Sequence, residues 1–177
     1  MGALTFITGG ARSGKSRLAE RLASRASGPI VYLATLEALD DEMRRRVTDH
    51  RNARPAAWRT VEEPLEVIDA LDRAGPYDAC VFDCVTLWLS NLLLRDREPL
   101  PAVEALIEWQ AKQAAALIVV SNEVGSGVVP EYELGRRFRD ALGEANQLLS
   151  AAASEAYVCV AGRAIDLRAL GKPIDAS

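Results

Sequence analysis

The octet GGARSGKS fits the spacing G-x-x-x-x-G-K-[ST], which is typical of a loop that binds the phosphates of a nucleotide. Glycines let backbone N–H groups turn inward around phosphate oxygens, and the N-terminus of a following helix adds positive potential. Lys15 is expected to reach the β- and γ-phosphates, and the Ser16 hydroxyl to ligate Mg²⁺. The octet follows an apolar run and precedes a helical pattern, which is the context that such a loop requires. It predicts these nucleotide-binding residues: Gly9, Gly10, Ala11, Arg12, Ser13, Gly14, Lys15 and Ser16.

Two carboxylates each follow an apolar run further along the chain. Asp83 ends ACVFD, the position at which such proteins place the second acid of the Mg²⁺ site, so Asp83 is predicted as a metal residue beside Ser16. Glu123 ends LIVVSNE, where it could assist the metal or deprotonate an acceptor hydroxyl. A helix-capping or loop role for Glu123 fits the sequence equally well.

The single histidine, His50, lies in the basic stretch RRRVTDHRNARP. Met43, Val47, His50 and Arg54 are spaced as one ridge of a helix, and the apolar start of that ridge should face the protein body. Neighbouring arginines disfavour the imidazolium, although Asp49 partly opposes them. A neutral imidazole can act as a nucleophile towards a polyphosphate held by the same arginines. A surface or capping histidine is the alternative, and the phosphate-binding octet favours the reactive one.

Apolar strand-like runs alternate with helical patterns along the chain, which predicts an α/β fold with a mostly parallel sheet and helices on both faces. Ligands then bind beyond the carboxyl ends of the strands. No repeat or linker is visible, so residues 1–177 are predicted to form one domain. After Asp166 the pattern is weak, and packing and fraying both stay open. Strands are expected at 3–8, 29–35, 57–63, 78–84, 115–122 and 156–162, and helices at 15–27, from Leu39 towards Pro55, and at 65–71, 86–95, 101–114 and 132–152.

Length, charge and composition argue against several classes of protein. A length of 177 residues suits one domain with a full core. A net charge of −4 argues against a nucleic-acid binder driven by overall charge, and a local basic patch stays open. The sequence has neither an apolar run of about 20 residues, which would span a bilayer, nor a signal-peptide pattern. A cytoplasmic protein without stable membrane insertion is therefore expected. The cysteines, Cys80, Cys84 and Cys159, are predicted to be reduced, mostly buried thiols that bind no metal.

Four segments together resemble the bifunctional adenosylcobinamide kinase / adenosylcobinamide-phosphate guanylyltransferase family. They are FITGGARSGKSRLAE, YLATLEALDDEMRRRVTDHRNARPAAWRTVEEP, the Asp83 strand with TLWLSNLL, and VVSNEVGSGVVPEYELGRRF with the sequence onward to Gly162. The resemblance implies a RecA-like P-loop NTPase fold. It also implies phosphorylation of adenosylcobinamide with ATP or GTP, followed by transfer of GMP from GTP to adenosylcobinamide phosphate, which gives adenosyl-GDP-cobinamide.

The same resemblance implies roles for individual residues. His50 occupies the position of the histidine that becomes guanylylated, and Lys15 joins it as a catalytic residue. Some relatives carry a second histidine just before the nucleophile, whereas this chain has Asp49 there. Similar proteins are homotrimers. The further nucleotide contacts map onto Ala34, Thr35, Leu36, Arg51, Asn52, Ala53, Arg54, Glu62 and Cys84.

Two rival interpretations remain open. A P-loop small-molecule kinase without guanylyl transfer would need the octet and Asp83 but not His50, and the segment H-x-x-x-R-P-x-x-W-x-T-x-E argues against it. A nucleotide-dependent switch that acts by binding partners would usually carry an N-K-x-D segment for reading guanine, and this sequence has none.

Overall fold

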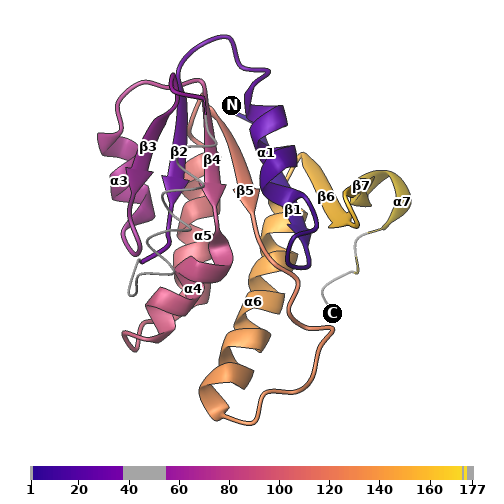
Figure 1. The fold of residues 1–177 in the computed structure, drawn as a ribbon. Coiled ribbons are helices and arrows are strands. Elements are labelled where there is room, and N and C mark those ends of the chain that lie inside the picture. The colour runs from indigo at the N-terminus through magenta and orange to yellow at the C-terminus, as the bar shows by residue number, and fades with distance from the viewer. Residues whose placement is uncertain (1, 38–54, 173, 175–177) are drawn as a thin grey trace.

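The computed structural model describes residues 2–37, 55–172 and 174. Within this part of the chain, seven strands form one sheet in the order β3-β2-β4-β5-β1-β6-β7 (Figure 1). All neighbouring strands are parallel except β6 and β7. The strands are β1 (Leu4–Gly9), β2 (Ile30–Ala34), β3 (Arg59–Glu62), β4 (Ala79–Asp83), β5 (Ala116–Val120), β6 (Glu155–Val160) and β7 (Arg163–Asp166).

The central strands are apolar on both faces, because each face of the sheet is covered. Every residue of β1 is buried, and β2, β4 and β5 each have four buried residues in succession. Continuous apolar runs of this kind are typical of parallel strands packed between helices. The edge strands β3 and β7 contain no buried residue, in keeping with their position.

The helices cover the two faces unequally (Figure 1). One face carries α1, whose Leu18 and Ala19 pack with Ile7 and Val81 of the sheet. The other described helices gather mainly on the opposite face, around a larger core that includes Phe82, Trp88 and Leu142. The prediction of helices on both faces is therefore confirmed. The helices are α1 (Lys15–Ala23), α3 (Val67–Arg73), α4 (Val85–Leu93), α5 (Pro99–Gln110), α6 (Glu133–Ala152) and α7 (Leu167–Leu170).

Most of the predicted elements are confirmed, with boundaries that differ by a few residues. The first helix ends at Ala23, four residues earlier than predicted, and the helix predicted at 101–114 spans Pro99–Gln110. The helix predicted from Leu39 towards Pro55 falls mostly on residues 38–54, outside the described part of the chain. No helix in the described part is both long and apolar enough to cross a lipid bilayer.

A hairpin at the end of the sheet was not predicted. Ala161 and Gly162 have φ values of 49° and 78° and reverse the chain between β6 and β7. Asp166 then caps α7 by accepting hydrogen bonds from the N–H groups of Arg168 and Ala169. The residues after Asp166 therefore begin with a short helix.

The three cysteines are free and buried, as predicted. Burial raises the pKa of the Cys80 and Cys84 thiols to about 12, so both are protonated near neutral pH. The described residues contain no group of three or more histidine, cysteine or acidic side chains that could hold a metal ion by themselves.

Candidate active site

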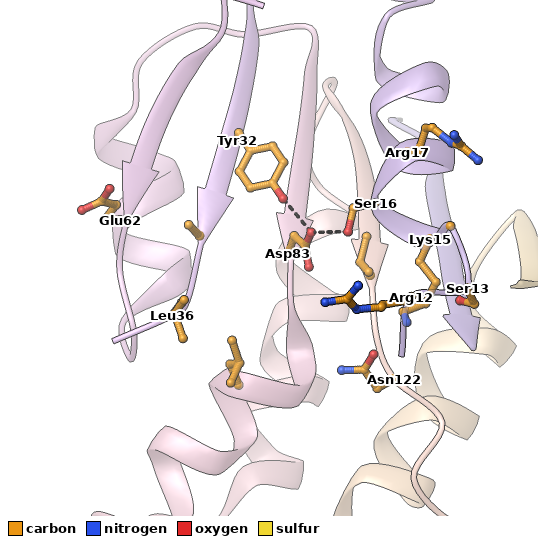
Figure 2. A pocket seen from close by; sticks show the side chains of 14 residues that line it. Arg12, Ser13, Lys15, Ser16, Arg17, Tyr32, Leu36, Glu62, Asp83 and Asn122 are labelled. Atoms are coloured by element: carbon orange, nitrogen blue, oxygen red, sulfur yellow. Dashed lines mark hydrogen bonds between the residues drawn. The ribbon is translucent and has the colours of Figure 1, made fainter. Parts of the chain in front are cut away.

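A cavity of about 660 Å³ opens at the carboxyl edge of the sheet, between the loop after β1 and the ends of β2 and β4 (Figure 2). Its volume lies in the range of small-molecule sites. Three cationic side chains, Arg12, Lys15 and Arg17, line it together with the carboxylates Glu62 and Asp83. The remaining lining residues are Ser13, Gly14, Ser16, Tyr32, Ala34, Leu36, Leu87, Val120 and Asn122.

The loop of residues 9–16, called the P-loop from here on, depends on glycine at two points. Gly9 has a φ of 143°, and a Cβ there would lie 2.3 Å from the Cys159 carbonyl oxygen of β6. Gly14 has a φ of 102° and forms the N-cap of α1. Residues that carry a side chain rarely adopt such φ values, so both positions favour glycine. The loop is also tied to the β6–β7 turn, because the Gly162 N–H donates to the Ser13 carbonyl oxygen at 3.0 Å.

Lys15 is buried, with 7% of its surface exposed, and its ammonium group folds back over the P-loop. Its Nζ donates to the carbonyl oxygens of Gly9 at 2.8 Å and Gly10 at 2.7 Å. Burial lowers the pKa of Lys15, while the Asp83 carboxylate partly offsets this by favouring the ammonium. These bonds hold a positive charge within the loop in which phosphates are predicted to bind.

Asp83 forms the acidic centre of the cavity (Figure 2). Its Oδ2 accepts from the Ser16 hydroxyl at 2.8 Å and from the Tyr32 hydroxyl at 2.6 Å. The paired Ser16 and Asp83 oxygens suit Mg²⁺, which proteins commonly hold through one or two oxygen ligands while substrate phosphates and water supply the rest. Tyr32 donates from β2, so it fixes the orientation of the carboxylate.

Behind the cavity, buried hydrogen bonds connect the ends of β2 and β4. The Thr35 hydroxyl donates to the Cys84 carbonyl oxygen at 2.7 Å and accepts from the Cys84 N–H at 3.0 Å. The Asn91 amide of α4 donates to the carbonyl oxygens of Thr35 at 2.8 Å and Pro64 at 3.1 Å. Thr35 and Cys84 therefore support the site and do not line it.

A family model described as cobinamide kinase / cobinamide phosphate guanyltransferase matches residues 5–167. The chain belongs to this family. The bifunctional adenosylcobalamin biosynthesis protein CobP of Pseudomonas aeruginosa is 46% identical over 172 residues, which cover 96% of this chain and 98% of that protein. The bifunctional adenosylcobalamin biosynthesis protein CobU of Escherichia coli is 39% identical, over 93% of this chain and 99% of that protein.

Two solved structures resemble this chain in fold alone. A Pyrococcus horikoshii protein superposes with a TM-score of 0.56 at 10% identity, covering 93% of this chain and 85% of that one. An ATPase of a bacterial type III secretion system superposes with a TM-score of 0.54 at 12% identity, covering 97% of this chain and 59% of that one. Together with the parallel sheet and the P-loop, these likenesses confirm the predicted P-loop NTPase fold.

In this member of the cobinamide kinase family, the structure brings many of the residues predicted for the site to one cavity. Arg12, Ser13, Gly14, Lys15, Ser16, Ala34, Leu36, Glu62 and Asp83 line it. Gly9, Gly10, Ala11, Thr35 and Cys84 are not among the lining residues, and Gly9 and Gly10 instead offer carbonyl oxygens to Lys15. His50, Arg51, Asn52, Ala53 and Arg54 lie outside the described residues.

Five lining residues were missed from sequence: Arg17, Tyr32, Leu87, Val120 and Asn122. Tyr32 carried a signal, because a tyrosine in a buried strand needs a partner for its hydroxyl. Asn122 follows a strand that ends at the same edge as Asp83, but the sequence directed attention to Glu123. Glu123 is exposed, and its Oε1 accepts from the Gly125 N–H at 2.6 Å, which is the geometry of a loop carboxylate.

We expect two variants of this cobinamide kinase family member to lose Mg²⁺ affinity to different degrees. Asp83→Asn removes the charge of the carboxylate and should sharply raise the Mg²⁺ concentration needed to bind a GTP analogue. Tyr32→Phe removes only the hydroxyl that orients Asp83, and changes of that kind cost about tenfold or more in metal affinity. Titration of Mg²⁺ with a fluorescent, non-hydrolysable GTP analogue measures both shifts without requiring turnover.

Tyr77→Phe is the matched control, since Tyr77 lies shortly before the first residue of β4, at the end of that strand away from the cavity. It should leave the Mg²⁺ titration unchanged. An unchanged titration for Asp83→Asn would reassign Asp83 to a structural role.

Proposed function

We propose that this protein phosphorylates the aminopropanol hydroxyl of adenosylcobinamide with ATP or GTP. It then transfers GMP from GTP to adenosylcobinamide phosphate, which gives adenosyl-GDP-cobinamide and pyrophosphate. The observation that carries the proposal is membership of the cobinamide kinase / cobinamide phosphate guanyltransferase family, whose model matches residues 5–167. The convergence of Lys15, Ser16 and Asp83 in one cavity supports the phosphoryl-transfer half independently.

In the first reaction, the acceptor hydroxyl oxygen attacks the γ-phosphorus and the bond from that phosphorus to the β–γ bridging oxygen breaks. The nucleoside diphosphate leaves with the electron pair, and the hydroxyl proton passes to solvent. The P-loop N–H groups and Lys15 hold the phosphates, so the barrier is lowered mainly by positioning and charge stabilisation. Mg²⁺, when bound at Ser16 and Asp83, would offset charge on the β- and γ-phosphate oxygens.

In the second reaction, an imidazole nitrogen of His50 attacks the α-phosphorus of GTP. A nitrogen–phosphorus bond forms, the α–β bridging bond breaks, and pyrophosphate leaves. A phosphate oxygen of adenosylcobinamide phosphate then attacks the same phosphorus and releases the histidine. The nucleotide contacts assigned to Arg51, Asn52, Ala53, Arg54 and Glu62 belong to this proposal as well, and Cys84 supports the site from behind the cavity.

The proposal also covers the domain organisation, oligomeric state, localisation and ligands of the enzyme. It acts as one domain of 177 residues, as a homotrimer in the cytoplasm, with GTP, ATP, adenosylcobinamide and its phosphate as partners. Nucleic acid and stable membrane insertion play no part in it. Sedimentation analysis of the purified protein tests the trimer.

The decisive experiment incubates the protein with GTP labelled at the α-phosphorus and Mg²⁺, denatures it, and searches for acid-labile label on the protein. A phosphoramidate bond to histidine is acid-labile, so we expect label that is lost in acid and retained in base. Unlabelled adenosylcobinamide phosphate should discharge it into adenosyl-GDP-cobinamide. Phosphorylation of adenosylcobinamide without any protein label would instead favour a P-loop kinase that lacks the guanylyl step.

A further inference from the structure

Asn122 lies just beyond β5, the strand between β1 and β4. Val120, two residues earlier, pairs in register with Ile7 of β1 on one side and Asp83 of β4 on the other. Because Ile7 leads into the P-loop, Asn122 extends past the strand end between the phosphate-binding loop and the acidic centre. Because Lys15 and a Mg²⁺ ion at Ser16 and Asp83 are expected to hold the β- and γ-phosphates, Asn122 lies where the γ-phosphate is expected.

The backbone around Asn122 is held from both sides. Its N–H donates to the Thr86 hydroxyl of α4 at 2.8 Å, and its carbonyl oxygen accepts from the Asn146 amide of α6 at 3.1 Å. Ser121 fixes the orientation of Asn146 by donating to its Oδ1 at 2.6 Å. The next N–H, that of Glu123, donates to the Gly9 carbonyl oxygen at 3.1 Å, which joins this corner directly to the P-loop.

The side-chain amide of Asn122, by contrast, has no hydrogen-bond partner among the residues that the structure describes, although it lines the cavity and is half-buried. Figure 2 shows it on the same side of the cavity as the Arg12 side chain, which extends from the P-loop. The Asn122 backbone is held in place while its side-chain amide is unpaired, so the amide is available to a ligand. Its N–H donors match the oxygens of a phosphoryl group.

We propose that Asn122 is a catalytic residue of phosphoryl transfer, whose amide N–H donates to an oxygen of the γ-phosphoryl group. The proposal deepens the kinase half of the proposed function and rests on it for the identity of the acceptor. As the acceptor oxygen bonds to the γ-phosphorus and the bond to the β–γ bridging oxygen breaks, the equatorial oxygens carry the negative charge. A fixed amide donor stabilises that charge without reorganising.

Two variants test this role through nucleotide binding and kinase kinetics. Asn122→Ala removes the donor, and Asn122→Asp keeps the shape but presents a carboxylate to the phosphate. With Mg²⁺, both should weaken binding of β,γ-imido-GTP about tenfold or more while leaving GDP binding unchanged, since GDP lacks the contacted group. The kcat for phosphorylation of adenosylcobinamide should fall about a hundredfold, with aspartate below alanine, because removing one such donor costs that much.

Gln113→Ala is the control. Gln113 also carries a side-chain amide, but it lies in the turn before β5, at the end of that strand away from the cavity. It should change neither the ratio of β,γ-imido-GTP affinity to GDP affinity nor the kcat for phosphorylation of adenosylcobinamide. Equal losses of β,γ-imido-GTP and GDP binding, or wild-type kcat in both variants, would overturn the role of Asn122. A wild-type protein that phosphorylates no corrinoid would defeat the proposed function, and the ratio of triphosphate to diphosphate affinity would still decide whether Asn122 contacts the γ-phosphate.

Discussion

Lys15→Ala is expected to abolish both phosphorylation of adenosylcobinamide and labelling by α-labelled GTP. Both reactions require the triphosphate seated on the P-loop, and Lys15 is the buried cation of that loop. Loss of a charge that clamps the transferring phosphates removes stabilisation of the transition state as well as binding, and such losses reach about a thousandfold. Steady-state kinetics with the corrinoid acceptor and a filter assay for protein-bound label measure the two activities separately.

The variant also leaves two backbone carbonyl oxygens without their donor, so its folding must be checked. Thermal unfolding followed by circular dichroism provides that check. Lys112→Ala is the matched control, because Lys112 is an exposed lysine in the turn after α5, away from the cavity. Near-normal kinase activity in a folded Lys15→Ala protein would show that the P-loop assignment is wrong.

His50→Ala is expected to separate the two activities. Phosphoryl transfer to the acceptor hydroxyl is a direct displacement at the γ-phosphorus and needs no protein nucleophile. GMP transfer through a covalent intermediate needs one, and the chain contains one imidazole. The variant should therefore retain GTP binding and phosphorylate adenosylcobinamide, but take no label from α-labelled GTP and form no adenosyl-GDP-cobinamide.

Lys15→Ala provides the contrast in the same assays, since it should lose both activities. A His50→Ala protein that still takes up label at the wild-type rate would place the nucleophile elsewhere. If both activities were lost in a correctly folded His50→Ala protein, the histidine would have a role in nucleotide binding in place of a purely nucleophilic one.

The sheet was predictable because its central strands are buried on both faces. ALTFIT and ALIVV are continuous apolar runs, and such runs leave little choice other than a parallel sheet between helices. β7 was not predictable in the same way, because all four of its residues are exposed and carry no apolar pattern. Its pairing follows from the turn at Ala161 and Gly162, which is a local backbone property with a weak sequence signal.

The residues of the site were predictable where a sequence motif determines their positions. They were not predictable where the order of the strands brings them together. Ser16 and Asp83 are 67 residues apart, yet their side chains meet at 2.8 Å as expected for the Mg²⁺ site of a P-loop protein. Tyr32 and Asn122 reach the same cavity only because β2, β4, β5 and β1 are neighbours in the observed order. Nothing local to either residue specifies that order.

The bond from the Gly162 N–H to Ser13 makes the edge hairpin a reporter of the P-loop. A backbone amide exchanges its hydrogen with solvent only when its hydrogen bond opens, and the rate reflects the free energy of that local opening. A nucleotide that stabilises the P-loop therefore raises the cost of opening at Gly162, although the hairpin itself lies outside the residues that line the cavity. Hydrogen exchange at this one amide would follow nucleotide occupancy without any label on the ligand.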